Sequence, residues 1–249
     1  MKPDENGMAL MIAVWAVILI GGLVTGMVAM GGGDAAITAN RIETARAGAL
    51  AEAGVLRAVA ALTDPAAREK LELDQPFTVQ LEDAASITVV VRDSCGAIDL
   101  NWAPGALLRA YGVAEGMSHA AAARFASAIE ARREAGPEET ADGLPSHPWQ
   151  SLDQLNALPD MDRATLNRII PGLTVNCREA GADPRLAPAL VREALQLSGA
   201  TGSPSHGLAY EIEAQARLAS GARVTLRAAI WLSRQPGPPA YYITGWRSL

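Results

Sequence analysis

The sequence has no excess of positive charge and few of the residues that catalytic and metal sites use. Its 21 Lys and Arg against 27 Asp and Glu give a formal net charge of −6, which argues against a protein that binds nucleic acid through a broad basic surface. The three histidines are His119, His147 and His206, and the chain has neither a Gly-x-Ser-x-Gly nor a His-Glu-x-x-His motif. We therefore expect no enzyme, no cofactor for catalysis, no small-molecule substrate and no nucleic-acid partner.

Charge is also missing near the N-terminus, where no Asp, Glu, Lys or Arg occurs from residue 6 to residue 33. Residues 8–30 are apolar, and as a helix they would rise about 35 Å, enough to span a hydrocarbon core about 30 Å thick. A cleaved secretory signal usually has a shorter apolar core, and a buried helix of a large protein is a further interpretation. We favour a single-pass anchor in a bacterial inner membrane, with Lys2 in the cytoplasm and the C-terminal domain in the periplasm.

A short charged leader followed by Asn6-Gly7-Met8 resembles the processing site of type IV prepilins. The resemblance implies that a prepilin peptidase cuts between Gly7 and Met8 and methylates the new N-terminus. Pilins usually carry a Glu at the fifth mature position, whereas this chain has Ile12 there. The departure either excludes the resemblance or selects one branch of the family.

An alanine-rich stretch without proline follows, from residue 34 to residue 64, and ends before Pro65. Its apolar residues recur at mixed three-, four- and seven-residue steps, which predicts an amphipathic helix with a narrow apolar stripe. The stripe consists of Ile37, Ile42, Ala45, Ala49, Leu56, Val59 and Leu62. An ordinary surface helix packed on a sheet and a stem that continues the membrane helix are both compatible with this pattern.

Residues 46–55, Arg-Ala-Gly-Ala-Leu-Ala-Glu-Ala-Gly-Val, with Leu62 after them, resemble the stem of the general secretion pathway protein K family. These proteins are the large minor pseudopilins of type II secretion systems, and they also lack the Glu that Ile12 replaces here. The resemblance therefore turns Ile12 into a supporting observation.

Two pairs of β-type runs predict two hairpins. The first is residues 77–81 with 86–91, and the second is residues 209–219 with 222–232; residues 241–246 predict a last short strand. The section between the hairpins is expected to be helical, at residues 104–112, 118–133, 151–158, 163–170 and 188–197. Ser151 with Gln154 is a capping pattern for the third of these helices.

Three stretches of this section resemble the same family: residues 92–104 with a Gly-Ala-Ile-Asp-Leu-Asn core, residues 149–159, and residues 181–188. The resemblance implies an α+β fold, in which a pilin-like antiparallel sheet is interrupted by a large inserted helical domain of the SAM or helix-hairpin-helix type. The implied division is a prepilin leader at 1–7, a transmembrane helix at 8–33, stem and sheet at 34–95 and 205–249, and the inserted domain at 96–204.

The resemblance also implies a role. A subunit without the N-terminal Glu and with a bulky insertion is expected at the tip of the pseudopilus, where it helps to initiate assembly and the export of folded proteins across the outer membrane. The implied partners are the minor pseudopilins I and J, with H, the prepilin peptidase and the inner membrane.

Cys95 and Cys177 are the only cysteines, and in an oxidising compartment they could form a disulfide or remain buried thiols. Glu138, Glu139 and Asp142 lie in an acidic Gly/Pro loop. Oxygen-rich loops can bind Ca²⁺, a solvated loop is the alternative, and the resemblance implies a structural calcium site here.

Residues 151–174 also resemble a helix-hairpin-helix unit, which can hold a phosphate through backbone N–H groups. Asp160 and Asp162 in its turn would repel a phosphate, so a packing module for protein contacts is the better interpretation. The alternative function for the whole chain is a bitopic periplasmic binding protein that uses this unit.

Overall fold

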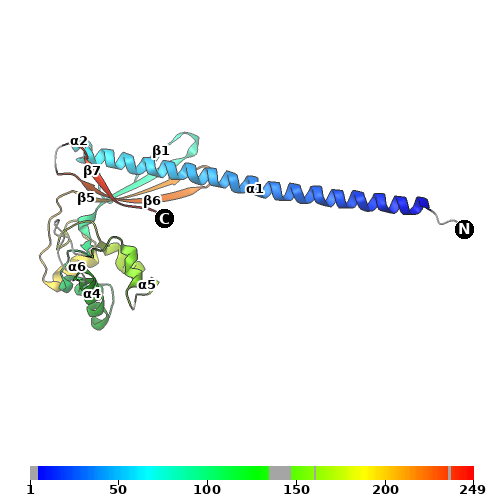
Figure 1. The fold of residues 1–249 in the computed structure, drawn as a ribbon. Coiled ribbons are helices and arrows are strands. Elements are labelled where there is room, and N and C mark those ends of the chain that lie inside the picture. The colour runs from blue at the N-terminus through cyan, green and yellow to red at the C-terminus, as the bar shows by residue number, and fades with distance from the viewer. Residues whose placement is uncertain (1–4, 135–146, 160, 235–236) are drawn as a thin grey trace.

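The computed structural model describes residues 5–134, 147–159, 161–234 and 237–249, without the side chains of residues 5–9, 24–35 and 83. Its largest element is a single helix, α1 (Glu5–Thr63), of 59 residues, about 90 Å long at 1.5 Å per residue. The three consecutive glycines at 31–33 do not interrupt it. The stem therefore continues the apolar N-terminal helix, as predicted, and the N-terminal part of α1 projects far beyond the rest of the molecule (Figure 1).

The stem ends at the predicted place. Asp64 follows α1, and its side chain accepts a hydrogen bond from the Ala66 N–H at 3.0 Å. It thereby caps the short helix α2 (Pro65–Arg68), which begins with a proline, the residue best suited to a first helical position.

The predicted strands form one antiparallel sheet of five strands in the order β1-β2-β5-β6-β7. The expected first hairpin pairs Phe77 with Val89, and the second pairs Ala209 with Trp231. The bounds are β1 (Phe77–Gln80), β2 (Ser86–Asp93), β5 (Ala209–Arg217), β6 (Arg223–Leu232) and β7 (Tyr241–Ser248), with a 3₁₀ turn η1 (Glu82–Ala84) between β1 and β2.

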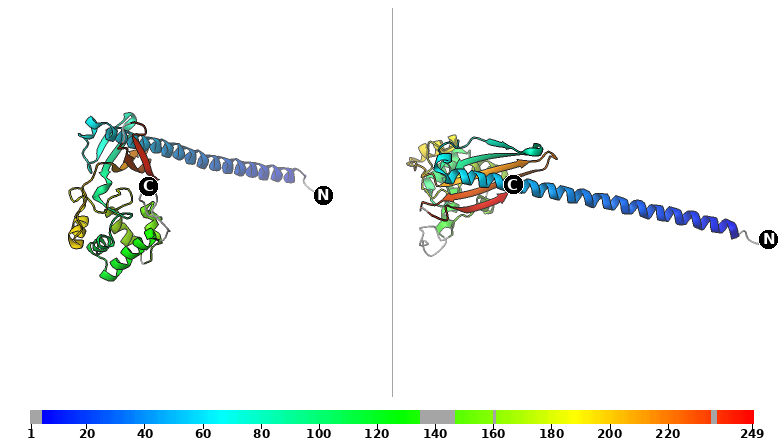
Figure 2. Two further views of the ribbon diagram at one scale, coloured as in Figure 1. Left: turned by 60° about the vertical axis from the view of Figure 1, so that its left-hand side comes forward. Right: turned by 90° about the horizontal axis from the view of Figure 1, so that it is seen from above.

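Helix α1 lies over one face of this sheet, against β2, β5 and β6 (Figure 2), but with a different face from the predicted one. Val59 and Leu62 are buried as expected, whereas Ile37, Ile42 and Leu56 are 53%, 61% and 47% exposed. Ala45 and Ala49 are exposed too. The side of α1 that meets the sheet is mostly small: Ala47, Ala51, Gly54, Val55 and Ala58. Small side chains let the helix approach the strands closely, and a search for large apolar residues overlooks such a face.

Between β2 and β5 the chain forms helices, on the far side of the sheet from α1 (Figure 1). They are α3 (Gly105–Ala114), α4 (His119–Glu134), α5 (Arg163–Ile169) and α6 (Ala189–Ser198), joined by the 3₁₀ turns η2 (Ser94–Gly96), η3 (Leu152–Ala157) and η4 (Ile170–Gly172). We call residues 94–205 the helical part. Four of its five predicted helices are thus present as α-helices.

The remaining predicted helix, at residues 151–158, is the 3₁₀ turn η3 instead. Ser151 accepts from the Asp153 N–H at 3.1 Å, and the Gln154 amide oxygen accepts from the Gln150 N–H rather than from the residue at the cap. Leu158 is extended, with φ −75° and ψ 141°, as a residue before proline prefers to be, so Pro159 ends this segment after two short turns.

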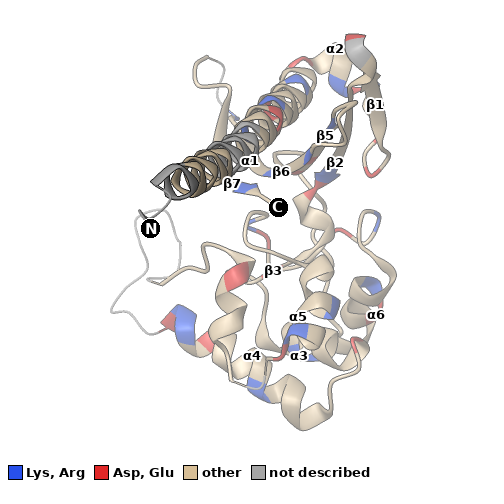
Figure 3. Ribbon diagram, turned by 90° about the vertical axis from the view of Figure 1, so that its right-hand side faces the viewer, with Lys and Arg blue, Asp and Glu red and all other residues tan. Residues whose placement is uncertain are grey.

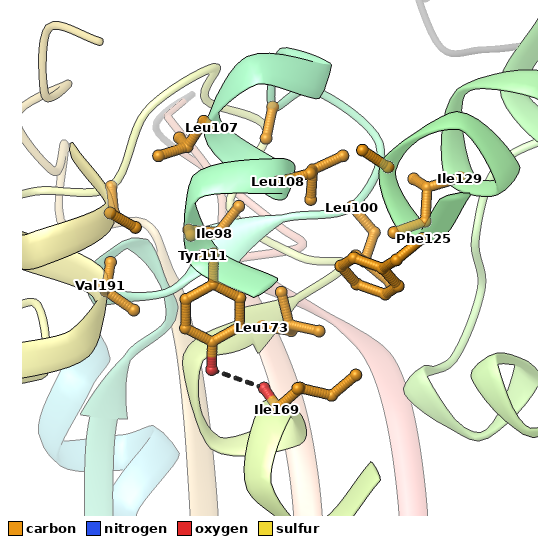
Figure 4. Close-up of a cluster of buried hydrophobic side chains, with 14 of the residues drawn as sticks. Ile98, Leu100, Leu107, Leu108, Tyr111, Phe125, Ile129, Ile169, Leu173 and Val191 are labelled. Atoms are coloured by element: carbon orange, nitrogen blue, oxygen red, sulfur yellow. Dashed lines mark hydrogen bonds between the residues drawn. The ribbon is translucent and has the colours of Figure 1, made fainter. Parts of the chain in front are cut away.

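The helical part has its own hydrophobic cluster, separate from the cluster between α1 and the sheet. Tyr111 lies at its centre, fully buried, with its hydroxyl 2.8 Å from both the Ile169 carbonyl and the Glu115 carboxylate (Figure 4). Two short strands, β3 (Ile98–Asp99) and β4 (Leu173–Thr174), pair in parallel beside it. They were not predicted, because two residues are too few to show an alternating pattern.

Candidate assembly surface

The projecting part of α1 carries an unbroken apolar surface. Between residues 10 and 23, ten large apolar side chains are each 51–70% exposed: Leu10, Met11, Ile12, Val14, Trp15, Val17, Ile18, Leu19, Ile20 and Leu23. Such a surface marks a site that another apolar surface covers. Ile12, where pilins carry Glu, is 66% exposed and belongs to it.

Two predictions made for this end of the chain lie partly outside the described residues. The side chains at the expected cleavage site, Gly7 and Met8, and those of the C-terminal third of the expected span are not described. Within the side chains that are described, no helix holds a stretch apolar and long enough to traverse a membrane.

After residue 35, the first charged residue of α1 is Arg41, and Figure 3 shows charged residues on the part of α1 that lies beside the sheet. Glu43 accepts a hydrogen bond from the Ser220 hydroxyl at 2.7 Å, in the turn between β5 and β6. Ile42, next to Glu43 in the sequence, and Ile37, six residues before Glu43, are both exposed. Exposed apolar side chains therefore also occur on α1 beside the edge of the sheet.

Asp99, in the Gly-Ala-Ile-Asp-Leu-Asn stretch, connects distant segments of the helical part. Its buried carboxylate accepts from the N–H groups of Asn101 (2.8 Å), Cys177 (2.8 Å) and Arg178 (2.9 Å). Burial raises the pKa of Asp99 to about 6, although these three hydrogen bonds lower it. The side chain therefore positions backbone rather than facing solvent.

Cys95 and Cys177, the predicted candidates for a disulfide, are bonded, with their Cα atoms 4.9 Å apart. The Cys95 carbonyl also accepts from the Asp183 N–H at 2.7 Å. Asp183 is buried, and its ion pair with Arg185 lowers the pKa of its carboxyl below the ordinary value of 3.8. The end of β2 is thereby tied to two remote segments of the helical part.

A second tie uses Asp93, the last residue of β2. Its carboxylate accepts from the Cys95 N–H at 2.8 Å and from the Ser205 hydroxyl at 2.5 Å. Burial raises the pKa of Asp93, and the hydrogen bond from Ser205 opposes the rise. On the edge strand β7, Arg247 donates to both carboxylate oxygens of Asp153 at 2.6 Å. The helical part is therefore fastened to the sheet both at the end of β2 and at β7.

The predicted calcium ligands, Glu138, Glu139 and Asp142, lie outside the described residues. Across the described ranges, no three His, Cys, Asp or Glu side chains come together in a way that could hold a metal ion. The calcium site therefore stays a prediction.

The three histidines belong to different segments: His119 to α4, and His147 and His206 to loops. His119 is the first residue of α4, and His206 has its Nε2 atom 3.5 Å from a carboxylate oxygen of Glu179. The hydroxyl of Ser205 donates to Asp93 and not to the adjacent His206. The serine–histidine neighbours in the sequence thus do not form a catalytic pair.

Comparison with known proteins finds a similar fold among solved structures. No protein-family model and no curated protein matches the chain. Among solved structures, a chain of the GspK-GspI-GspJ complex from the enterotoxigenic Escherichia coli type 2 secretion system matches with a TM-score of 0.53 and 12% identity. The match covers 82% of this chain and 94% of that chain. The two chains share a fold of helices on an antiparallel sheet, which confirms the predicted fold class at that level.

Proposed function

We propose that this chain is a minor pseudopilin, a component of the pseudopilus of a type II secretion system. The observation that carries the proposal is the shared fold, because the match spans nearly the whole of a chain from a pseudopilin complex. The form of α1 supports the proposal, because the C-terminal half of the helix packs on the sheet while the N-terminal half projects beyond it. In this proposal other helices pack against the projecting half of α1, in a membrane before assembly and in a fibre afterwards.

The proposed position is the tip of the fibre. In a pilin, the Glu near the N-terminus pairs with the amine of the adjacent subunit, because a buried unpaired charge is expensive. Ile12 cannot form that pair, which suits a subunit with no neighbour above it. The helical part lies at the end of the molecule farthest from the N-terminus (Figure 1), where it would clash with a subunit stacked on top.

The proposed partners follow from this position. Minor pseudopilins I and J, with H, would contact the stem, the prepilin peptidase would cut after Gly7, and residues 8–30 would hold the subunit in the inner membrane before assembly. The work at the tip would be initiation of the fibre and export of folded proteins. None of these steps requires bond chemistry from this chain.

Co-purification tests the proposal. The full-length chain, co-expressed with pseudopilins I and J of the same system and extracted in detergent, should elute with them as one complex. Ile42→Asp, on the exposed apolar side of the stem, should weaken the complex. Thr44→Asp, two residues further and also exposed, is the matched control. A chain that elutes alone, or variants that behave alike, would count against the proposal.

We also propose that Glu138, Glu139 and Asp142 hold a structural Ca²⁺. Carboxylate oxygens are the ligands this ion prefers. An ion that binds the folded state but not the unfolded state raises the midpoint of thermal unfolding. Adding a chelator should lower the midpoint of the wild type and leave that of an E138Q/E139Q/D142N variant unchanged. An unchanged wild-type midpoint would remove the calcium site.

A further inference from the structure

A cleft of about 380 Å³ lies between the sheet and the helical part. One wall is the face of the sheet opposite α1, because side chains alternate between the faces of a strand and the neighbours Ile212 and Ala214 point toward α1. This wall carries Arg92, Glu211 and Glu213, together with Arg227. It is the polar face of the sheet, and the helical part covers it incompletely.

The charged side chains of this wall form a chain of ion pairs. Arg92 lies 3.6 Å from Asp74 and 3.9 Å from Glu213, and Arg227 lies 2.7 Å from Glu213 and 3.5 Å from Glu211. Acids and bases alternate, and the chain begins and ends on an acid. Three carboxylates thus face two guanidinium groups, which leaves one negative charge in excess.

The two terminal acids, Asp74 and Glu211, each have one ion-pair contact, at 3.6 Å and 3.5 Å, and among the described residues neither carboxylate accepts a hydrogen bond. The central Glu213, in contrast, accepts a hydrogen bond from Arg227 at 2.7 Å. Glu211 is the more buried of the two terminal acids, with its side chain 31% exposed against 54% for Asp74, so it has lost more of its hydration. A half-buried carboxylate without a donor is an acceptor for an incoming cation.

The opposite wall is apolar. Leu152, Ile170 and Leu186 line it half-buried, and Pro171 and Pro188 form its exposed rim. The lining also includes Ser94, whose buried hydroxyl has no hydrogen-bond partner in the described part of the chain. A carboxylate on one side and aliphatic surface on the other suit a long side chain with an apolar stem and a cationic end.

We propose that this cleft binds a lysine or arginine side chain of a partner polypeptide, with the cationic group at Glu211 and the aliphatic stem along Leu186. A bare metal ion fits less well, since the described residues offer no group of three metal-ligating side chains. The apolar rim favours a polypeptide over a free amine, because residues that flank the basic side chain would rest on Pro171 and Pro188. The inference does not depend on the proposed role in a pseudopilus.

Titration of the detergent-purified full-length chain with two peptides tests the inference. The probes are acetyl-Leu-Arg-Leu-amide and the same peptide with citrulline, which keeps the shape of arginine but lacks the charge. Binding is followed by calorimetry on the wild type, on Glu211→Gln and on Glu193→Gln. Glu193 is an exposed acid of α6 outside the cleft, so its variant controls for the general loss of a negative charge.

The arginine peptide should bind the wild type and Glu193→Gln alike, and at least about tenfold more weakly to Glu211→Gln, the loss of a hydrogen bond to a charged group. The citrulline peptide should bind the wild type at least about tenfold more weakly than the arginine peptide does. Equal affinity for the two peptides, equal affinity of the wild type and Glu211→Gln, or no binding up to about 10 mM would overturn the inference.

A third titration, with free arginine amide, distinguishes a basic side chain within a polypeptide from a free amine. If it binds as tightly as the peptide, the flanking residues contribute nothing and the assignment to a polypeptide is wrong. If Glu211→Gln does not fold, as seen by circular dichroism, the comparison of arginine with citrulline on the wild type still decides the outcome. A negative result in every arm would leave co-purification with the pseudopilins unaffected, so the two proposals fail separately.

Discussion

Asn101 and Trp149 hold each other by two hydrogen bonds across 48 residues of sequence. The Asn101 side-chain amide donates to the Trp149 carbonyl at 2.9 Å, and the Trp149 N–H donates to the Asn101 Oδ1 atom at 2.7 Å. Both residues are buried, and the guanidinium carbon of Arg132 lies 4.4 Å from the centre of the Trp149 ring. Two of the stretches that resemble the pseudopilin family thus meet in one contact.

Asn101→Ala removes both of these hydrogen bonds and leaves a buried N–H and a buried carbonyl of Trp149 without partners. Each unsatisfied group costs about 1–3 kcal/mol, so we expect the free energy of unfolding to fall by roughly 2–6 kcal/mol. Denaturant titration measures the loss. Asn156→Ala is the control, because Asn156 is exposed and makes a single local hydrogen bond; equal losses in the two variants would contradict the assigned role of Asn101.

Gly54 and Gly48 provide a second test, of the close packing between α1 and the sheet. A Cβ atom at Gly54 would lie 2.7 Å from Cγ2 of Ile87, whereas one at Gly48 would have no neighbour within 4 Å. Alanine gains up to about 1 kcal/mol over glycine within a helix. Gly48→Ala should therefore raise the midpoint of unfolding and Gly54→Ala should lower it. A stabilising Gly54→Ala would show that the stem is packed more loosely than described.

The contrast between these glycines also shows what the sequence could reveal about the fold. The β-type runs at residues 209–219 and 222–232, with a turn between them, predicted β5 and β6. Most of the packed face of α1 was not predicted, because it consists largely of alanine together with Gly54, whereas the larger Ile37 and Ile42 lie on the exposed side. Where a helix lies close to a sheet, the size of its apolar side chains is therefore a poor predictor of which face is buried.

The functional features divide in a similar way. The apolar run and Ile12 could be found by inspection, and so could both cysteines, although spacing alone does not fix their pairing. The cleft could not be found, because Asp74, Arg92 and Glu211 come together only through the strand register and the return of the chain beside β2. Ion pairs across strands depend on register, which hydrophobic patterns determine only indirectly.

Asp99 gives a prediction for the pH dependence of stability. Its pKa is about 6 in the folded chain, against an ordinary value of 3.8, so the folded state binds more protons between about pH 4 and pH 6. The contribution of Asp99 is present below pH 3.8 and is lost as the pH rises through 6. Unfolding measured at several pH values should show this decline in the wild type relative to Asp99→Asn. Parallel profiles would exclude a raised pKa.

The disulfide between Cys95 and Cys177 gives a prediction for redox conditions. It joins residues 82 apart, and in the chain-entropy model a loop of this length contributes about 4–5 kcal/mol to stability. The double variant Cys95→Ser/Cys177→Ser should unfold at a lower denaturant concentration by a corresponding amount. A reductant should shift the wild type toward the variant and leave the variant unchanged. A reductant without effect on the wild type would mean that the thiols are not linked in solution.

Intact-mass spectrometry of the chain, expressed with a prepilin peptidase and extracted from the membrane, tests the proposed class of protein most directly. Removal of seven residues from the 249 of the sequence would leave a chain that begins at Met8 and carries one N-terminal methyl group. A pseudopilin should show this mass, and Gly7→Ala, at the cleavage site, should block the change. A mass that corresponds to a chain with residues 1–7 still attached in the presence of an active peptidase would contradict the proposal.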